Sequence, residues 1–83
     1  LVNMLVGLIS IGHGLKGPNI SCVTACASGT HAIGEAYKSI GLGNAKKMLV
    51  IGAEAVICPV GIAGFASMKA LSSRNEDPRH ASR

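Results

Sequence analysis

Apolar residues recur along the chain in two patterns, one typical of helices and one typical of buried strands. The first segment, residues 3–14, has its apolar positions at helical spacing. The short apolar runs 20–25 and 47–53 resemble strands of a sheet that is covered on both faces. Residues 30–42 again show helical spacing, and Pro59 opens a third helix that we expect to continue to Leu71. The predicted order is therefore helix, strand, helix, strand, helix.

Strands that alternate with helices predict an α/β layered fold with a mainly parallel sheet. The central strand–helix–strand unit is expected to form a right-handed crossover. In its helix, one face is predicted to carry Ile33, Tyr37 and Ile40, whereas Glu35, Lys38 and Ser39 lie toward the other. After Ser72 the chain becomes polar, which is typical of a surface loop.

The composition predicts a piece of a larger protein rather than a small free-standing domain. The 83 residues are 48% apolar and only 14% charged, with 11 glycines. A small domain buries only roughly 60% of its unfolded surface, so its exterior has to be more polar than this. We therefore expect residues 1–83 to form part of one α/β domain and to contain no complete domain, and we expect no stable fold from the piece alone.

Charge and cysteine content exclude several classes of function. The net charge of +4 comes without a basic run or interleaved aromatic residues, so nucleic-acid binding is not predicted. The apolar stretch 1–11 is too short to span a bilayer, and no membrane association is predicted. Three cysteines without a CxxC pair indicate free thiols in a reducing compartment. No cofactor is predicted. No metal site is predicted either, because Cys22 and Cys26 match no zinc-ligand spacing.

The candidate for chemistry is Cys26, in the run VTACASGTH. It is predicted to lie where a buried strand meets a helix, whose unpaired N–H groups and dipole stabilise a thiolate and an oxyanion. Small neighbours leave room for a thioester-linked substrate. The alternative is a buried structural cysteine. Cys22 and Cys58 are expected to be inert, and His31 is expected to be structural rather than a base for Cys26.

The run GLKGPNISCVTACASGTHAIGEA resembles the nucleophile region of the β-ketoacyl-[acyl-carrier-protein] synthases, in the form found in type II elongating enzymes. The later segments MLVIGAEA and PVGIAGFASMKALSSRNEDPRHASR resemble the family's next strand and the stretch that follows it. The resemblance covers essentially the whole chain. It implies a thiolase-like fold, with this chain in the N-terminal half.

The resemblance also implies roles for individual residues. Cys26 matches the cysteine that takes an acyl group from acyl carrier protein as a thioester and whose backbone N–H forms half of an oxyanion hole. Val56, Gly61 and Phe65 match positions that line the acyl pocket, and Lys69 matches a basic residue that contacts the carrier protein. For Phe65 and Lys69 the alternatives are an ordinary core residue and a solvated lysine.

The expected activity is decarboxylative Claisen condensation with malonyl carrier protein in fatty-acid elongation. A polyketide-type ketosynthase and a non-catalytic ketosynthase-like partner subunit are the alternatives. The resemblance implies a homodimer, and the expected compartment is the bacterial cytosol, with an organelle as the alternative. The family's later histidines and lysine are not among these residues, and chain-length preference is not predicted.

Overall fold

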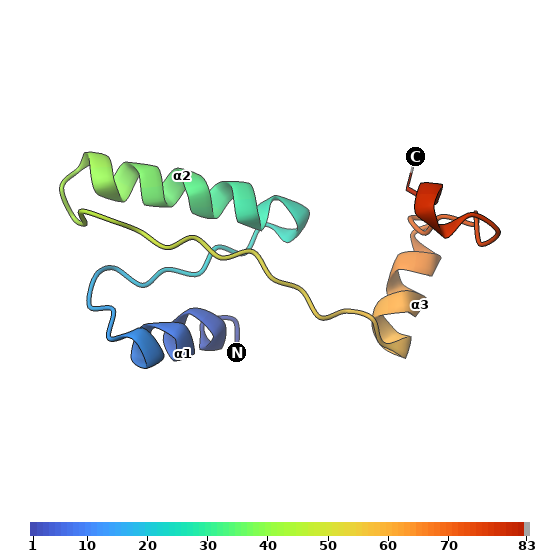
Figure 1. Ribbon diagram of the computed structural model, residues 1–83, viewed down its shortest axis with the longest axis horizontal. Coiled ribbons are helices and arrows are strands. Elements are labelled where there is room, and N and C mark those ends of the chain that lie inside the picture. The colour runs from blue at the N-terminus through green and yellow to red at the C-terminus, as the bar shows by residue number, and fades with distance from the viewer. Residues whose placement is uncertain (83) are drawn as a thin grey trace. The chain divides into compact units, whose positions relative to one another are not determined.

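The computed structural model describes residues 1–82, which fall into two compact units with their boundary in the chain between Ala53 and Glu54 (Figure 1). The first unit holds three elements: helix α1 (Met4–His13), a 3₁₀ turn η1 (Ala25–Ala27) and helix α2 (Ser28–Gly41). The second holds helix α3 (Pro59–Ser67) and a 3₁₀ turn η2 (Pro78–His80). All three predicted helices are confirmed, with α3 ending four residues before its expected last residue, Leu71.

Helix α1 ends where a glycine takes a backbone conformation that other residues rarely adopt. Gly14 has a φ of 63° and a left-handed backbone, and the Leu15 N–H donates to the Ser10 carbonyl over 2.9 Å. Helices commonly end in this way because glycine has no Cβ to clash. The following loop is tied back to the helix by Asn19, whose Nδ2 donates to Ser10 Oγ over 2.8 Å.

Helix α2 has a different inward face from the one that its hydrophobic pattern suggests. Its two buried residues are Ala36 and Ser39. The apolar stripe predicted for this helix stays exposed to solvent, with Ile33 60%, Tyr37 80% and Ile40 44% accessible. Ser39, which the pattern assigns to the polar side, is therefore packed inward. The buried positions of α2 are therefore small side chains, whereas its larger apolar residues are exposed.

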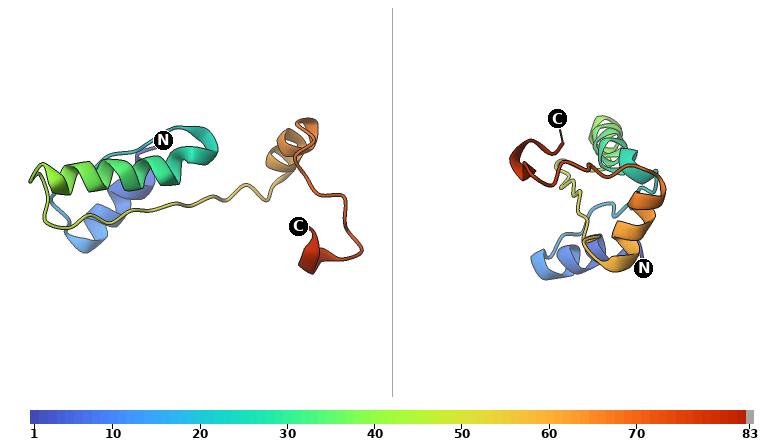
Figure 2. Two further views of the ribbon diagram at one scale, coloured as in Figure 1. Left: turned by 90° about the horizontal axis from the view of Figure 1, so that it is seen from above. Right: turned by 90° about the vertical axis from the view of Figure 1, so that its right-hand side faces the viewer.

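The two predicted strands do not form as strands among residues 1–82, so this part of the fold prediction is not borne out. Residues 20–24 and 47–53 have irregular backbone, and no backbone hydrogen bond joins the two segments. In Figure 1 both segments run in the same direction between α1 and α2, and Figure 2 shows the same segments from two further sides. An apolar run predicts an extended segment, but a strand also requires a neighbour that supplies a ladder of hydrogen bonds.

Helix α3 begins and ends differently from α1. Pro59 occupies its first turn, as predicted. At its other end a lysine takes the place that glycine usually fills: Lys69 has a φ of 57°, and the Ala70 N–H donates to the Phe65 carbonyl over 3.0 Å. The polar tail then folds on itself, since Arg74 Nη1 donates to the His80 carbonyl over 3.1 Å.

Very little apolar surface is buried within this chain. Ala36 is the one buried hydrophobic residue among residues 1–82. The chain exposes 7104 Å² of accessible surface, whereas a folded protein of its mass exposes about 4,600 Å². Exposed apolar side chains on this scale indicate surfaces that other protein normally covers.

Among residues 1–82 no helix combines the length and the apolarity that a membrane crossing requires.

Candidate active site around Cys26

Cys26 lies in the middle of the 3₁₀ turn η1, directly before α2, and its side chain is exposed. The prediction placed it at the junction of a buried segment and a helix. The structure places it one short turn ahead of α2, which begins at Ser28. The turn is closed by two backbone hydrogen bonds, from the Ala27 N–H to the Thr24 carbonyl over 3.0 Å and from the Ser28 N–H to the Ala25 carbonyl.

The residue before Cys26 has an unusual backbone conformation. Ala25 has a φ of 50°, in the left-handed region that residues with a Cβ seldom occupy. Holding an alanine there costs about 1–2 kcal/mol. Such conformations are concentrated at functional sites, where the surrounding structure keeps them in place. The reversal at Ala25 turns the chain sharply, so that Cys26 projects from the corner rather than continuing the preceding extended segment.

Side-chain hydrogen bonds hold this corner on the side of α2. Ser28 Oγ accepts from the Thr24 N–H over 2.9 Å and donates to the Ala25 carbonyl over 2.8 Å. One hydroxyl therefore bonds to both residues that precede Cys26. The contact spans the bend, because Thr24 and Ala25 lie before it and Ser28 is the first residue of α2.

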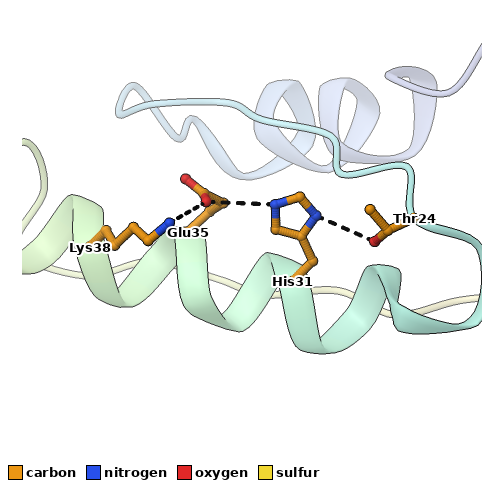
Figure 3. Close-up of polar contacts among 4 residues, drawn as sticks. All are labelled: Thr24, His31, Glu35 and Lys38. Atoms are coloured by element: carbon orange, nitrogen blue, oxygen red, sulfur yellow. Dashed lines mark hydrogen bonds and ion pairs between the residues drawn. The ribbon is translucent and has the colours of Figure 1, made fainter.

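A second contact reaches Thr24 from the next turn of α2 (Figure 3). His31 Nδ1 lies 3.3 Å from Thr24 Oγ1, and His31 Nε2 lies 3.6 Å from Glu35 Oε1. One arrangement of protons suits both contacts: the Thr24 hydroxyl donates to Nδ1, and the Nε2–H faces the carboxylate. Both ring nitrogens of His31 thus face groups other than Cys26, and a structural role for His31 stays a prediction.

Glu35 continues this row of polar groups along α2. Its Oε1 accepts a hydrogen bond from Lys38 Nζ over 2.9 Å. That hydrogen bond and the positive charge of Lys38 lower the pKa of Glu35, with a smaller contribution from His31. The same contacts raise the pKa of Lys38. The carboxylate is therefore kept ionised beside His31.

The backbone N–H of Cys26 makes no hydrogen bond among residues 1–82, although both of the following N–H groups in the turn are bonded. An exposed thiol and an N–H without a hydrogen bond are two groups that nucleophilic acyl transfer can use. In such a transfer a sulfur attacks a carbonyl carbon, and an N–H can donate to the oxygen as negative charge develops on it.

The other two cysteines differ from Cys26 in their surroundings. Cys22 is half-buried in the segment before the turn, and Cys58 is exposed at the N-cap of α3. All three thiols are free. Among the described residues, no group of three or more histidine, cysteine, aspartate or glutamate side chains is gathered closely enough to bind a metal ion.

The residues predicted for the acyl pocket and the carrier contact all belong to the second unit. Val56 and Phe65 are half-buried there, and Lys69 is exposed directly after α3. Gly61 has a local explanation that the sequence did not suggest: a Cβ at this position would overlap the Val56 carbonyl oxygen. The close approach of these two backbones requires glycine, whether or not the residue also gives space to a ligand.

Sequence reasoning missed Thr24 and Ser28 as parts of this site. Nothing in the hydrophobic pattern marks them, because both are small polar residues in a run of other small residues. The available signal was the spacing: a serine two residues after the candidate nucleophile is close enough to bond back across a tight turn. Its use here depends on the reversed backbone at Ala25, which a sequence alone does not reveal.

Comparison with known proteins gives a consistent result over the entire chain. Residues 1–83 match the family described as Beta-ketoacyl synthase, N-terminal domain. The chain is 54% identical over 83 residues to a 3-oxoacyl-[acyl-carrier-protein] synthase 2 of Synechocystis sp. and 51% identical over 83 residues to one of Vibrio harveyi. It is 45% identical over 84 residues to a mitochondrial 3-oxoacyl-[acyl-carrier-protein] synthase of Arabidopsis thaliana.

Each of these matches covers 100% of the chain but only 18–20% of the relative. The chain therefore spans about one fifth of the length of the curated relatives that it matches.

Proposed function

Because this chain belongs to the β-ketoacyl synthase family, through its N-terminal domain, we propose that it is part of a 3-oxoacyl-[acyl-carrier-protein] synthase that extends fatty-acyl chains. The observation that carries the proposal is Cys26, an exposed thiol at a sharply reversed turn before α2, with its own N–H unengaged among the described residues. The names of the relatives support an acyl carrier protein as the partner.

The proposed reaction has two stages. In the first, the Cys26 thiolate attacks the carbonyl carbon of an acyl thioester on the carrier protein. The carrier sulfur leaves as a thiolate, which takes up a proton from water, and the acyl group stays on Cys26. The N–H of Cys26 donates to the oxyanion of the tetrahedral intermediate. This stage uses groups that the present chain contains.

In the second stage, a malonyl thioester on the carrier protein loses carbon dioxide. The electron pair of the broken bond becomes an enolate, whose carbon attacks the acyl carbonyl on Cys26. Collapse of the intermediate breaks the carbon–sulfur bond, releases the Cys26 thiolate and leaves a β-ketoacyl chain two carbons longer. The groups that promote decarboxylation are proposed to lie in other parts of the whole protein, so the 83 residues alone are expected to be inactive.

Three further roles are part of the proposal. Val56, Gly61 and Phe65 line the acyl pocket, and Lys69 contacts the acidic carrier protein, as the family resemblance implies. The exposed position of Lys69 suits such a contact, and apolar walls suit a saturated chain. We propose that the segments 20–25 and 47–53 pair into a parallel sheet of a thiolase-like fold in the whole protein.

The remaining parts of the proposal concern assembly and location. The whole protein is proposed to be a homodimer, in which the apolar surfaces left exposed here are covered. Relatives whose names place them in mitochondria or chloroplasts make an organelle the alternative to the bacterial cytosol. Residues 1–83 are proposed to be part of one N-terminal domain rather than a complete one.

The test is a condensation assay with the full-length protein. Carrier protein loaded with an acyl group and carrier protein loaded with a malonyl group are supplied together. The β-ketoacyl product is identified and quantified by mass spectrometry, and its amount is compared with that of the released carbon dioxide. One carbon dioxide per product is expected. Transfer of the acyl group to Cys26 without any condensation would instead support a ketosynthase-like partner that lacks the second stage, and activity only with branched or modified extender units would favour the polyketide-type alternative.

A further inference from the structure

We propose that Ser28 and His31 are positioning residues that hold the turn of Cys26 in its reactive conformation, and that they act by fixing Thr24 from two sides. The side-chain polar contacts of both residues go to Thr24, Ala25 and Glu35 rather than to the Cys26 thiol. The inference rests on the proposed function, in that it assigns their role to the acyl transfer proposed for Cys26.

The first step of the argument is geometric. The chain reverses at Ala25, whose left-handed φ of 50° is unfavourable for a residue with a Cβ. A turn of this kind needs contacts that the relaxed alternatives lack, because otherwise the backbone would relax to an ordinary conformation. The relaxed conformation would move Cys26 away from the corner and change the direction of its N–H.

The second step identifies the contacts. Ser28 Oγ bonds the Thr24 N–H at 2.9 Å and the Ala25 carbonyl at 2.8 Å, so it fixes the backbone on both sides of the Thr24–Ala25 peptide. His31 Nδ1 lies 3.3 Å from Thr24 Oγ1 and fixes the side chain of the same residue. The backbone and the side chain of Thr24 are therefore both anchored to α2.

The third step concerns the orientation of the His31 ring. His31 is itself held from behind by Glu35, whose Oε1 lies 3.6 Å from Nε2 and is in turn bonded by Lys38 at 2.9 Å (Figure 3). This row sets the orientation of the imidazole ring, so that Nδ1 faces Thr24. A carboxylate that orients a histidine in this way favours the tautomer with its proton on Nε2, which leaves Nδ1 as an acceptor for the Thr24 hydroxyl.

The main experiment measures how fast Cys26 reacts in the full-length protein. Two rates are recorded for each variant: alkylation by iodoacetamide, followed by peptide mapping, and single-turnover acylation from carrier protein that bears an acyl thioester. Ser28→Ala is expected to slow acylation roughly 10- to 100-fold, the effect of misplacing a reacting group by about 1 Å. Ser28→Thr, which keeps the hydroxyl, is expected to restore most of the rate.

Matched controls separate positioning from loss of structure. Ser67→Ala also removes a serine hydroxyl that bonds a backbone carbonyl, that of Ala63 over 2.9 Å, but it does so in α3. Thr30→Ala changes the first turn of α2 at a residue whose side chain makes no hydrogen bond within residues 1–82. Both are expected to leave the two Cys26 rates unchanged. Melting temperature and the alkylation rate of Cys58 serve as internal checks in every sample.

A double-mutant cycle tests His31. Thr24→Val and His31→Leu each remove one partner of their contact, so each is expected to slow acylation, and the double variant is expected to be no slower than the worse single one. Full additivity would show that the two residues act independently and would overturn the anchoring of Thr24 by His31.

The outcomes for this inference and for the proposed function are distinct. Wild-type rates in Ser28→Ala overturn the inference while the condensing activity stands. A parallel rise in Cys58 alkylation and a fall in melting temperature would show general loosening, and would also overturn it. If the wild-type protein accepts no acyl group, the proposed function fails, and a selective change of Cys26 alkylation in Ser28→Ala then still supports the positioning of the thiol.

Discussion

Two cysteines in this chain lie at or just before the start of a helix, and they differ in backbone conformation and in the hydrogen bonding of their N–H groups. Cys26 lies in a reversed turn before α2, and Cys58 is the N-cap of α3 with an extended backbone, φ −147° and ψ 162°. Both are exposed. By distance from the start of a helix alone, Cys58 would be the better candidate for an activated thiol.

The hydrogen bonds distinguish the two positions. The Cys58 N–H donates to the Val56 carbonyl over 2.8 Å, and Pro59, which follows, has no N–H to offer. The Cys26 N–H is unengaged among residues 1–82. An oxyanion donor therefore accompanies one thiol and not the other. A position near a helix N-terminus therefore does not by itself make a cysteine suitable for acyl transfer. The cysteine also needs a nearby backbone N–H that is free to donate to the oxyanion.

The largest expected effect comes from removing the two thiols one at a time. Cys26→Ala is expected to abolish condensation by the full-length protein, because no other nucleophile replaces the sulfur. Cys58→Ala is expected to leave the activity close to that of the wild type. Both are measured by β-ketoacyl product formation, and equal losses in the two variants would refute the assignment.

A smaller effect is expected from the residue that reverses the chain. Ala25→Val places a β-branched side chain at positive φ, which is strongly unfavourable, and is expected to reduce acylation roughly tenfold or more. Ala25→Gly suits the same backbone and is expected to retain the activity. The pair is compared by single-turnover acylation, and an active Ala25→Val protein would show that the reversed turn is dispensable.

The start of α3 offers a matched test of stability. Gly61→Ala is expected to destabilise the full-length protein by about 1–3 kcal/mol, because the new Cβ would overlap the Val56 carbonyl and force the backbone apart. Gly64→Ala, in the same helix, meets nothing within 4 Å and serves as the control. Denaturant unfolding measures both. Equal stability of the two variants would contradict the close approach seen here.

The smallest effect concerns the ion pair of Glu35 and Lys38. The lowered pKa of Glu35 means that the pair contributes fully above the ordinary value of 4.5 and is lost as the pH falls through the lower folded-state value. The pKa of Lys38 is raised, so the pair is also lost when the pH rises through the folded-state pKa of Lys38, which lies in the alkaline range. Glu35→Gln is therefore expected to differ slightly from the wild type in unfolding experiments near neutral pH and to converge with it in acid. A difference that grows in acid would have the wrong sign.

The sequence predicted the helices of this chain better than its strands. Helix boundaries have local causes, such as the left-handed glycine at Gly14 and the proline at the start of α3. The apolar runs 20–25 and 47–53 predict extended backbone, but strand pairing depends on neighbours that a local pattern does not contain. The apolar face with Ile33 and Tyr37 is exposed for the same reason, because residues 1–82 contain no segment that covers it.

For the candidate site, the sequence singled out Cys26 and its neighbourhood but not its geometry. The motif of small residues around the cysteine carried the family resemblance, which the comparisons confirmed. The left-handed backbone of Ala25 and the two hydrogen bonds of Ser28 Oγ were not predictable from the sequence. Both depend on how the chain turns between the segment before Cys26 and α2. The pocket and carrier roles of Val56, Phe65 and Lys69 remain predictions.

The most direct test of the account identifies the thiol that accepts the acyl group. The full-length protein is incubated with carrier protein that bears an acyl thioester and is then digested at low pH to preserve thioesters. All three cysteine peptides are mapped by mass spectrometry. The account predicts that the acyl mass is found on the peptide of Cys26, with Cys22 and Cys58 unmodified. An acyl group on Cys58, or on none of the three, would contradict it.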